Sequence, residues 1–413
     1  MDIIETTVRK LEGALDRAEG LLSARLVQHD ASDAAQRLLD LFMAQRDDVA
    51  ALVQVGNVDV VATRCDVALA ELVRWTPLLG LIHRSKSSAN PFEMYGPLLA
   101  MAQQAVRPDI RLVVSSEWDF SPFTMPHGTT LEGFVFVGMP ATVPDKGLLI
   151  ALAGHEFGHS VWVVRDAKTV LGPAVFQVVW DRIRARLTEV LLALSAYHIQ
   201  DEAGLLTLDG LRAWRPACWW ALEQVEELFC DLFGLRLFGA AYAHAFAYLL
   251  APGLVDHRVQ TYPHPRSRAE VIVRAAQRWG ITLPADFVDV FLPPKPGTSA
   301  PGGLLGEIAD AAALDLVDRL LADAEGHARD RGFELPRAAV VELVRRDLAM
   351  VVPSDRGATL AELLCAGWQV RTDSGVWASL PHILAERHRV LDDLLLKSAQ
   401  VLEYHERIQA AAA

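Results

Sequence analysis

Apolar residues recur at helical spacing through the first quarter of the chain. From Val8 to Leu22 an apolar residue falls at every third or fourth position with charged residues between, and residues 34–53 repeat this pattern. The spacing predicts amphipathic helices across residues 1–107, and none of these residues forms a pattern typical of catalysis. Polar and helix-breaking residues at 84–91 predict a loop.

The pattern then changes to two short runs rich in β-branched and aromatic residues, 110–117 and 133–140. Both are bounded by Pro or Gly, as strands commonly are. The next segment, from Leu148 to Val164, is apolar on nearly every face, which predicts a buried helix. Further helices are expected at 174–198, 216–238 and 240–251. The expected fold class is mainly α with a small β-sheet (α+β).

A Pro- and Gly-rich stretch at 292–303 has the composition of a linker. The length of 413 residues allows two or three domains. We therefore expect a helical N-terminal region at 1–107, a core at 108–291, the linker at 292–303, and a helical C-terminal region at 304–413.

Charge and hydropathy exclude several classes of protein. Thirty-nine Lys and Arg against 52 Asp and Glu give a formal net charge of −13, which disfavours nucleic-acid binding through a basic face. The first residues include Asp2 and Glu5 and lack the apolar run of a signal peptide, so we expect a cytoplasmic protein. Arginine, histidine and proline interrupt the apolar segment Leu235–Val255, so no membrane span is expected.

The four cysteines lie far apart and form no CxxC pair. This spacing argues against a zinc ribbon, a thioredoxin motif and a disulfide framework, and it favours cysteines that act as small apolar core residues. They are Cys65, Cys218, Cys230 and Cys365.

The predicted buried helix contains the motif HExxH, His155 to His159. Residues four apart lie on one helical face, so His155 and His159 can bind one metal ion, with Glu156 placed to take a proton from a water at the open position of the metal. Burying these polar groups in an apolar helix is costly unless a metal satisfies them. The alternative is a pair of hydrogen-bonded core histidines.

A catalytic zinc normally takes three protein ligands, and no third histidine follows at the metzincin spacing. The best candidate is Glu227, with Asp231 four residues on, placed to accept the free ring N–H of a ligand histidine. Glu223 lies on the same face and competes with Glu227. Glu226 points about 100° away and is expected on a solvated face.

A loop after this helix carries groups that could stabilise a developing oxyanion. His264 is the first choice, followed by Tyr262 and Arg268. The competing interpretation is a Pro-rich turn with solvated arginines.

These motifs resemble the gluzincin metallopeptidases, and most closely the CAAX prenyl proteases and HtpX-like peptidases. The resemblance covers residues 110–274 and rests on the strand at 133–140, the HExxH motif, Glu227 with Asp231, and His264-Pro265 with Arg268. Two departures are Cys230, where the group usually has Ala, and the short distance from His264 to Arg268. The resemblance implies a zincin-like core without the transmembrane helices of the membrane-bound members.

The sequence therefore predicts a zinc metalloendopeptidase with one Zn²⁺ per chain, held by His155, His159 and Glu227, with Glu156 as the general base. The strand at 133–140 would offer an edge to an extended protein or peptide substrate. The helical ends would bind a protein partner, dimerise or cover the cleft. Alternatives are a zinc hydrolase of small amides and a peptidase-like binding or regulatory protein.

Overall fold

The computed structural model describes residues 3–22, 29–55, 57–85, 92–117, 131–140, 146–252, 259–293, 301–354, 356–380 and 386–412. These residues are mostly helical, and two strands form a small parallel sheet, so the predicted mainly α fold with a small β-sheet is confirmed. Contacts divide the chain into two compact units. The first comprises residues 1–103 and 107–146, and the second residues 104–106 and 147–413.

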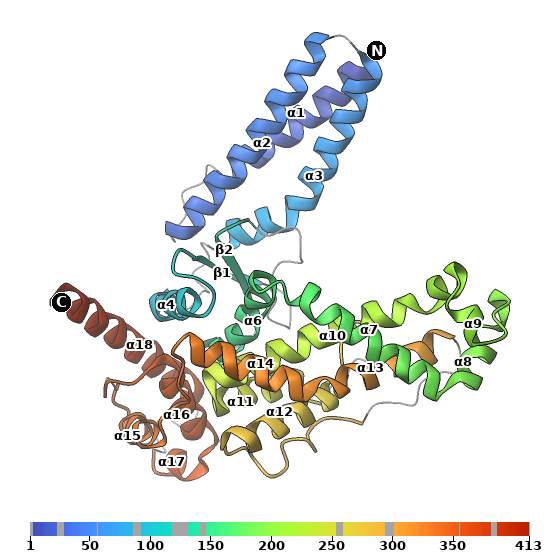
Figure 1. The fold of residues 1–413 in the computed structure, drawn as a ribbon. Helices are drawn as coiled ribbons and strands as arrows, with labels where there is room; N and C mark the ends of the chain where they lie inside the picture. The colour runs from blue at the N-terminus through green and yellow to red at the C-terminus, as the bar shows by residue number, and fades with distance from the viewer. Residues whose placement is uncertain are drawn as a thin grey trace. The chain divides into compact units, whose positions relative to one another are not determined.

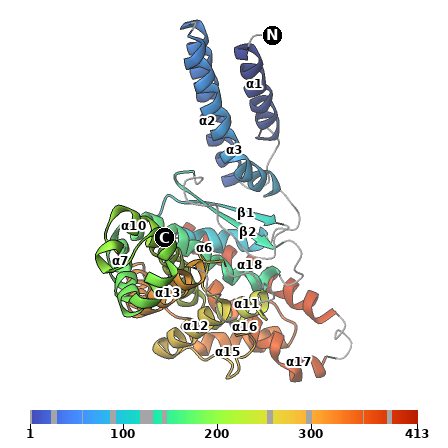
Figure 2. The ribbon, with the colours of Figure 1, turned by 90° about the vertical axis from the view of Figure 1, so that its right-hand side faces the viewer.

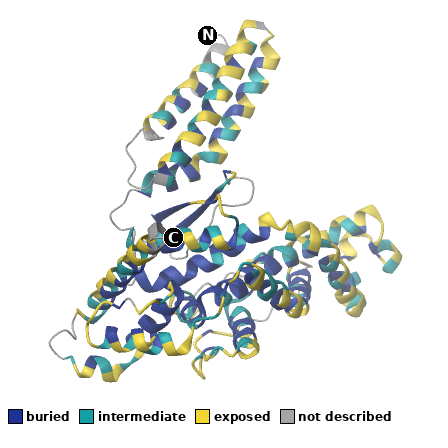
Figure 3. Cartoon of the chain, turned by 60° about the vertical axis from the view of Figure 1, so that its left-hand side comes forward, coloured by how far each residue is buried: buried dark blue, intermediate teal, exposed yellow. Residues whose placement is uncertain are grey.

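Three long helices pack together in the first unit (Figure 1). They are α1 (Ile3–Leu22), α2 (His29–Val55) and α3 (Val58–Arg84). Their apolar stripes, which the sequence shows as helical periodicity, meet in a shared core that includes Leu15, Leu38 and Leu78. Figure 3 shows buried and exposed residues alternating along these helices, as expected of an amphipathic bundle.

The sheet belongs to this first unit as well (Figure 2). Strands β1 (Arg111–Glu117) and β2 (Phe134–Pro140) pair in parallel, with Arg111 opposite Phe134 and Glu117 opposite Pro140. The 3₁₀ helix η1 (Phe92–Met94) and α4 (Tyr95–Ala105) precede them. Asp30 of α2 accepts hydrogen bonds from the Tyr95 hydroxyl and the Leu112 N–H, at 2.6 and 2.9 Å. The strands therefore pack with the N-terminal helices.

The described residues of the second unit form helices and their connections, without a strand. Its first helices are α5 (Lys146–Leu149, whose first residue belongs to the first unit), η2 (Ile150–Leu152), α6 (Ala153–Val164), α7 (Ala167–Ala185), α8 (Leu187–Ala193), η3 (Ser195–Tyr197) and α9 (Glu202–Leu205). The helices that follow are α10 (Leu208–Phe238), α11 (Ala240–Leu250), α12 (Pro265–Trp279), α13 (Pro301–Asp315), α14 (Val317–Asp330), α15 (Ala338–Ala349), α16 (Leu360–Thr372), α17 (Ser374–Ala378) and α18 (Arg387–Ala412).

Helix α10 is the centre of the second unit, because α6, α7, α11, α12, α13, α14 and α16 all pack against it. Every residue from Gln224 to Leu235 is buried. Helices α13 and α14 belong to this unit because apolar residues such as Leu305 and Ile308 pack inward. The two units therefore divide the chain differently from the expected boundaries at 107, 291 and 303.

Helix boundaries differ from the expected ones at three places. The helix expected from Leu148 to Val164 is divided into α5, η2 and α6. The helix expected at 174–198 starts earlier, at Ala167, and is interrupted at Arg186. Helix α10 starts at Leu208, two turns before the expected Pro216, because the Thr207 side chain caps it by accepting the Gly210 N–H. Most of the expected linker, residues 294–300, lies outside the described residues, and α13 begins at Pro301.

Among the described residues, one helical stretch, Gly147–Val164, is long and apolar enough to cross a membrane. This stretch is 72% buried within the protein, as is common for the core helix of a globular domain. The segment singled out from the sequence, Leu235–Val255, is broken by Gly239 between α10 and α11. The absence of a membrane span stays a prediction.

Glycines allow α6 and α10 to approach each other closely. A Cβ atom on Gly158 would lie 2.7 Å from the Cα of Cys230, and one on Gly154 would lie 2.9 Å from the Cα of Gly234. A side chain larger than hydrogen at either position of α6 would push the two backbones apart. The sequence interpretation missed these glycines, although their spacing of four residues is visible in it.

We expect Gly158→Ala to destabilise the protein by about 1–3 kcal/mol, because the added methyl group overlaps backbone that cannot move alone. The control is Gly172→Ala in α7, where a Cβ would meet no atom within 4 Å. That change should stabilise the helix by up to about 1 kcal/mol. Urea unfolding of both variants measures the difference, and equal free energies of unfolding would contradict the close approach.

Candidate metal centre

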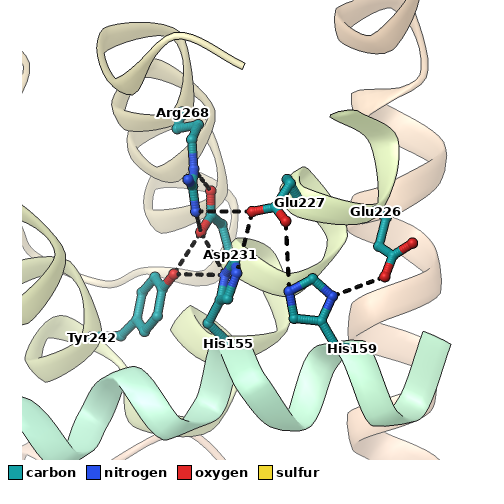
Figure 4. Close-up of polar contacts among 7 residues, drawn as sticks. All are labelled: His155, His159, Glu226, Glu227, Asp231, Tyr242 and Arg268. Atoms are coloured by element: carbon teal, nitrogen blue, oxygen red, sulfur yellow. Dashed lines mark hydrogen bonds and ion pairs between the residues drawn. The ribbon is translucent and has the colours of Figure 1, made fainter. Parts of the chain in front are cut away.

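The HExxH motif lies on α6, facing α10. His155 and His159 are one turn apart, and their ring centroids lie 4.9 Å from each other (Figure 4). Both rings point from α6 toward carboxylates of α10, and both side chains are largely buried, at 11% and 14% exposure. The two helices thus bring the predicted metal ligands together.

The Glu227 carboxylate faces the Nε2 atoms of both histidines. Its Oε2 lies 3.4 Å from Nε2 of His155, and its Oε1 lies 3.6 Å from Nε2 of His159. Two atoms that bind one tetrahedral zinc ion at about 2.0–2.1 Å are about 3.3 Å apart. The distance from Glu227 to each histidine nitrogen is therefore close to the separation of two ligand atoms on one zinc ion.

Asp231, one turn after Glu227, receives hydrogen bonds from three side chains and is fully buried. Its Oδ1 lies 3.0 Å from Nδ1 of His155 and accepts the Tyr242 hydroxyl at 2.6 Å. Arg268 of α12 donates to both carboxylate oxygens at 2.7 Å. With Nδ1–H of His155 donated to Asp231, the lone pair of that ring is on Nε2, toward Glu227.

Nearby charges shift the pKa values of Asp231, Glu227 and His155 in the direction opposite to the effect of burial. Burial alone would raise the pKa of Asp231, but the charge and hydrogen bonds of Arg268 hold that pKa well below its usual range. The pKa of Glu227 is also lowered despite burial, by its hydrogen bond to His155 and the nearby positive charges. Burial lowers the pKa of His155, but Asp231 and Glu227 together raise it to about 10. The carboxylates therefore favour a positive charge at His155, either a proton or a metal cation.

Glu226 is buried and hydrogen-bonded to the second histidine. Its Oε1 lies 2.8 Å from Nδ1 of His159, and its side chain is 5% exposed. The expectation of a solvated face was wrong, because α10 has packed neighbours on every side at this level. Glu223, the competing ligand, pairs with Lys168 at 2.7 Å.

Glu156 has an unsatisfied oxygen beside these groups. It is 2% exposed, and its Oε2 has no hydrogen-bond partner within the described part of the chain. Burial raises its pKa, which suits a residue that must take and return a proton. A buried carboxylate oxygen without a partner is costly, and a water held at the open position of a metal would satisfy it. The donor set and this oxygen both fit a zinc site.

Cys230 offers a competing donor. One ligand atom each from His155, His159 and Cys230 lie within 4.8 Å of one another. Burial raises the pKa of the Cys230 thiol well above its usual value, and the surrounding carboxylates raise it further. We favour Glu227 as the third ligand because its two oxygens lie 3.4 and 3.6 Å from the Nε2 atoms of His155 and His159. All four cysteines are free, and Cys65, Cys230 and Cys365 are buried as expected.

Two of the three candidates for oxyanion stabilisation, Tyr262 and His264, lie before α12. The negative charge of Glu227, together with burial, raises the pKa of Tyr262 to about 12, so its hydroxyl is electrostatically coupled to the metal site although the residue is 54% exposed. His264 caps α12, and its Nδ1 accepts the Arg266 N–H at 3.2 Å.

The sequence interpretation missed Tyr242 and assigned Arg268 a different role. Tyr242 lies on α11, and no motif marks it. Arg268 was considered for oxyanion stabilisation, whereas its guanidinium is bound to Asp231. Comparison of the chain with protein-family models, with curated proteins and with solved structures finds no match. Any function for this site therefore has to be inferred from its own chemistry.

We expect Glu227→Ala to reduce bound zinc from about one ion per chain to almost none, because two histidines alone hold zinc weakly. Cys230→Ala and Glu223→Ala should keep the ion. Metal content after dialysis, measured by mass spectrometry, separates the candidates. Loss of zinc in Cys230→Ala with retention in Glu227→Ala would assign the thiol as the ligand instead.

We expect Arg268→Met to destabilise the metal-free protein by about 3–5 kcal/mol near pH 7, because it leaves Asp231 buried without its cation. The lowered pKa of Asp231 in the native protein contributes stability above its unfolded pKa, and this contribution is lost as the pH falls through the native value. In the variant the pKa of Asp231 rises. Asp231 therefore becomes protonated as the pH falls toward about 4, and the variant is then destabilised less. Urea unfolding at both pH values tests this, and a pH-independent difference would contradict it.

Proposed function

We propose that this protein is a zinc-dependent metallopeptidase that cleaves peptide bonds within a protein or peptide substrate, with one zinc ion per chain. The observation that carries the proposal is the shared orientation of His155 and His159. Each ring directs Nδ1 to a carboxylate and Nε2 to Glu227. Two nitrogens and one carboxylate, with a further position open, match the ligand set of hydrolytic zinc enzymes.

A zinc ion bound by these residues would polarise the scissile carbonyl and lower the pKa of a bound water to about 7. Glu156 takes the proton of the attacking water and passes it to the leaving amine. Its buried, partnerless Oε2 and its raised pKa support this role. Tyr262 or His264 would donate a hydrogen bond to the developing oxyanion.

Asp231, Tyr242 and Arg268 hold the site in shape. The hydrogen bonds to Asp231 fix the ring of His155, and Arg268 also lies 3.6 Å from Glu227. Arg268 therefore offsets the negative charge of two carboxylates in one buried place. This arrangement favours a rigid ligand set whose atoms move little during catalysis.

Substrate recognition and location remain proposals. We propose that the edge of β2 pairs with an extended substrate. The helical regions at both ends are proposed to bind a protein partner. We also propose a cytoplasmic location without a membrane span.

We expect Glu156→Gln to retain zinc and to lose about 10²–10⁴-fold in the rate of peptide cleavage, because glutamine cannot accept the proton. The measurement is cleavage of an unbiased peptide library by the wild type and the variant, with zinc content determined in parallel. Cleavage at the wild-type rate by Glu156→Gln would contradict the mechanism. Hydrolysis of small amides but of no peptide by the wild type would favour the alternative hydrolase.

A further inference from the structure

We propose that Glu226 is a positioning residue of the metal centre, which fixes the tautomer of His159 and raises the affinity of the site for zinc through that ring. The inference rests on the proposed zinc site and deepens it. Glu226 is not one of the proposed ligands, and its proposed effect on zinc passes through its hydrogen bond to His159.

Two consecutive residues of α10 contact opposite sides of one imidazole ring (Figure 4). Glu226 lies 2.8 Å from Nδ1 of His159, and Glu227 lies 3.6 Å from Nε2 of the same ring. The shorter distance is that of a hydrogen bond, and the longer one is that of two ligands around a shared ion. The ring is thus held between a hydrogen-bond acceptor and the third ligand.

The hydrogen bond determines which nitrogen of His159 can bind metal. An ionised carboxylate can accept hydrogen bonds but cannot donate them. With Glu226 ionised, Nδ1 of His159 therefore carries the hydrogen and donates it to Glu226. Nε2 then carries the lone pair and faces Glu227. Electron density pushed toward Nε2 by the carboxylate makes the ring a stronger ligand.

The Glu226 carboxylate and the His159 ring are both removed from water. Both side chains are largely buried, at 5% exposure for Glu226 and 14% for His159. A carboxylate in such a place needs hydrogen bonds to offset the loss of water. Since Asp231 bonds Nδ1 of His155 in the same way, both ligand histidines have a carboxylate behind them. With zinc bound, the site would combine two histidine ligands with two carboxylates that orient their rings.

Glu226→Gln and Glu226→Ala test the role, with Glu223→Gln as the matched control. The control removes a carboxylate one turn earlier on α10, where it pairs with Lys168 outside the ligand set. The zinc dissociation constant of each variant is measured by competition with a chromophoric chelator. Cobalt-substituted forms are compared by visible absorption, which reports the ligand field, and urea unfolding checks that each variant is folded.

We expect about a 10-fold weaker zinc affinity in Glu226→Gln and up to about 100-fold in Glu226→Ala, with a shifted cobalt spectrum in both. Glu223→Gln should match the wild type. Wild-type zinc affinity and an unchanged cobalt spectrum in both Glu226 variants would overturn this inference alone. The inference would also be overturned if the unfolded fraction of each Glu226 variant accounted for all of its weaker zinc affinity and its folded fraction gave the wild-type cobalt spectrum. A wild-type protein that binds no zinc would overturn the proposed function as well.

Discussion

The pairing of the buried Asp231 carboxylate with Arg268 is the interaction on which the centre of the second unit depends. Asp231 lies on α10, Arg268 on α12, Tyr242 on α11 and His155 on α6, so one fully buried carboxylate joins four helices. An unpaired charge in that place would be very costly, and the two charge-assisted hydrogen bonds from Arg268 offset the cost. Arg268 holds the Asp231 carboxylate in place, and that carboxylate in turn orients the ring of His155.

Close packing of α6 against α10 is the second requirement. Gly154 and Gly158 bring the backbones together, which places two histidines of one helix opposite Glu226, Glu227 and Asp231 of the other. A larger separation would move the imidazole nitrogens out of reach of the carboxylates. His155 and His159 can therefore reach the carboxylates of α10 only because Gly154 and Gly158 have no side chains.

Features that are local in sequence could be predicted. His155 and His159, and likewise Glu227 and Asp231, are four residues apart on a helix, so their shared face follows from helical geometry. The strands could be predicted from their β-branched composition. Glu226 could not be placed in this way, because a helical wheel shows its direction but not that packed helices surround α10. Tyr242 and the true partner of Arg268 depend on how α11 and α12 cross α10, and no local pattern reports that crossing. The division into two units likewise depends on contacts between distant segments, such as Asp30 with Leu112.

X-ray absorption at the zinc edge of the purified protein tests the ligand set most directly, because it reports which elements surround the metal. We expect one zinc ion per chain with a first shell of nitrogen and oxygen only, at about 2.0–2.1 Å, and the outer-shell scattering of two imidazole rings. A sulfur neighbour at about 2.3 Å would place Cys230 in the first shell and contradict a site built from His155, His159 and Glu227. Protein purified with zinc supplied and carrying none would contradict the metal centre itself.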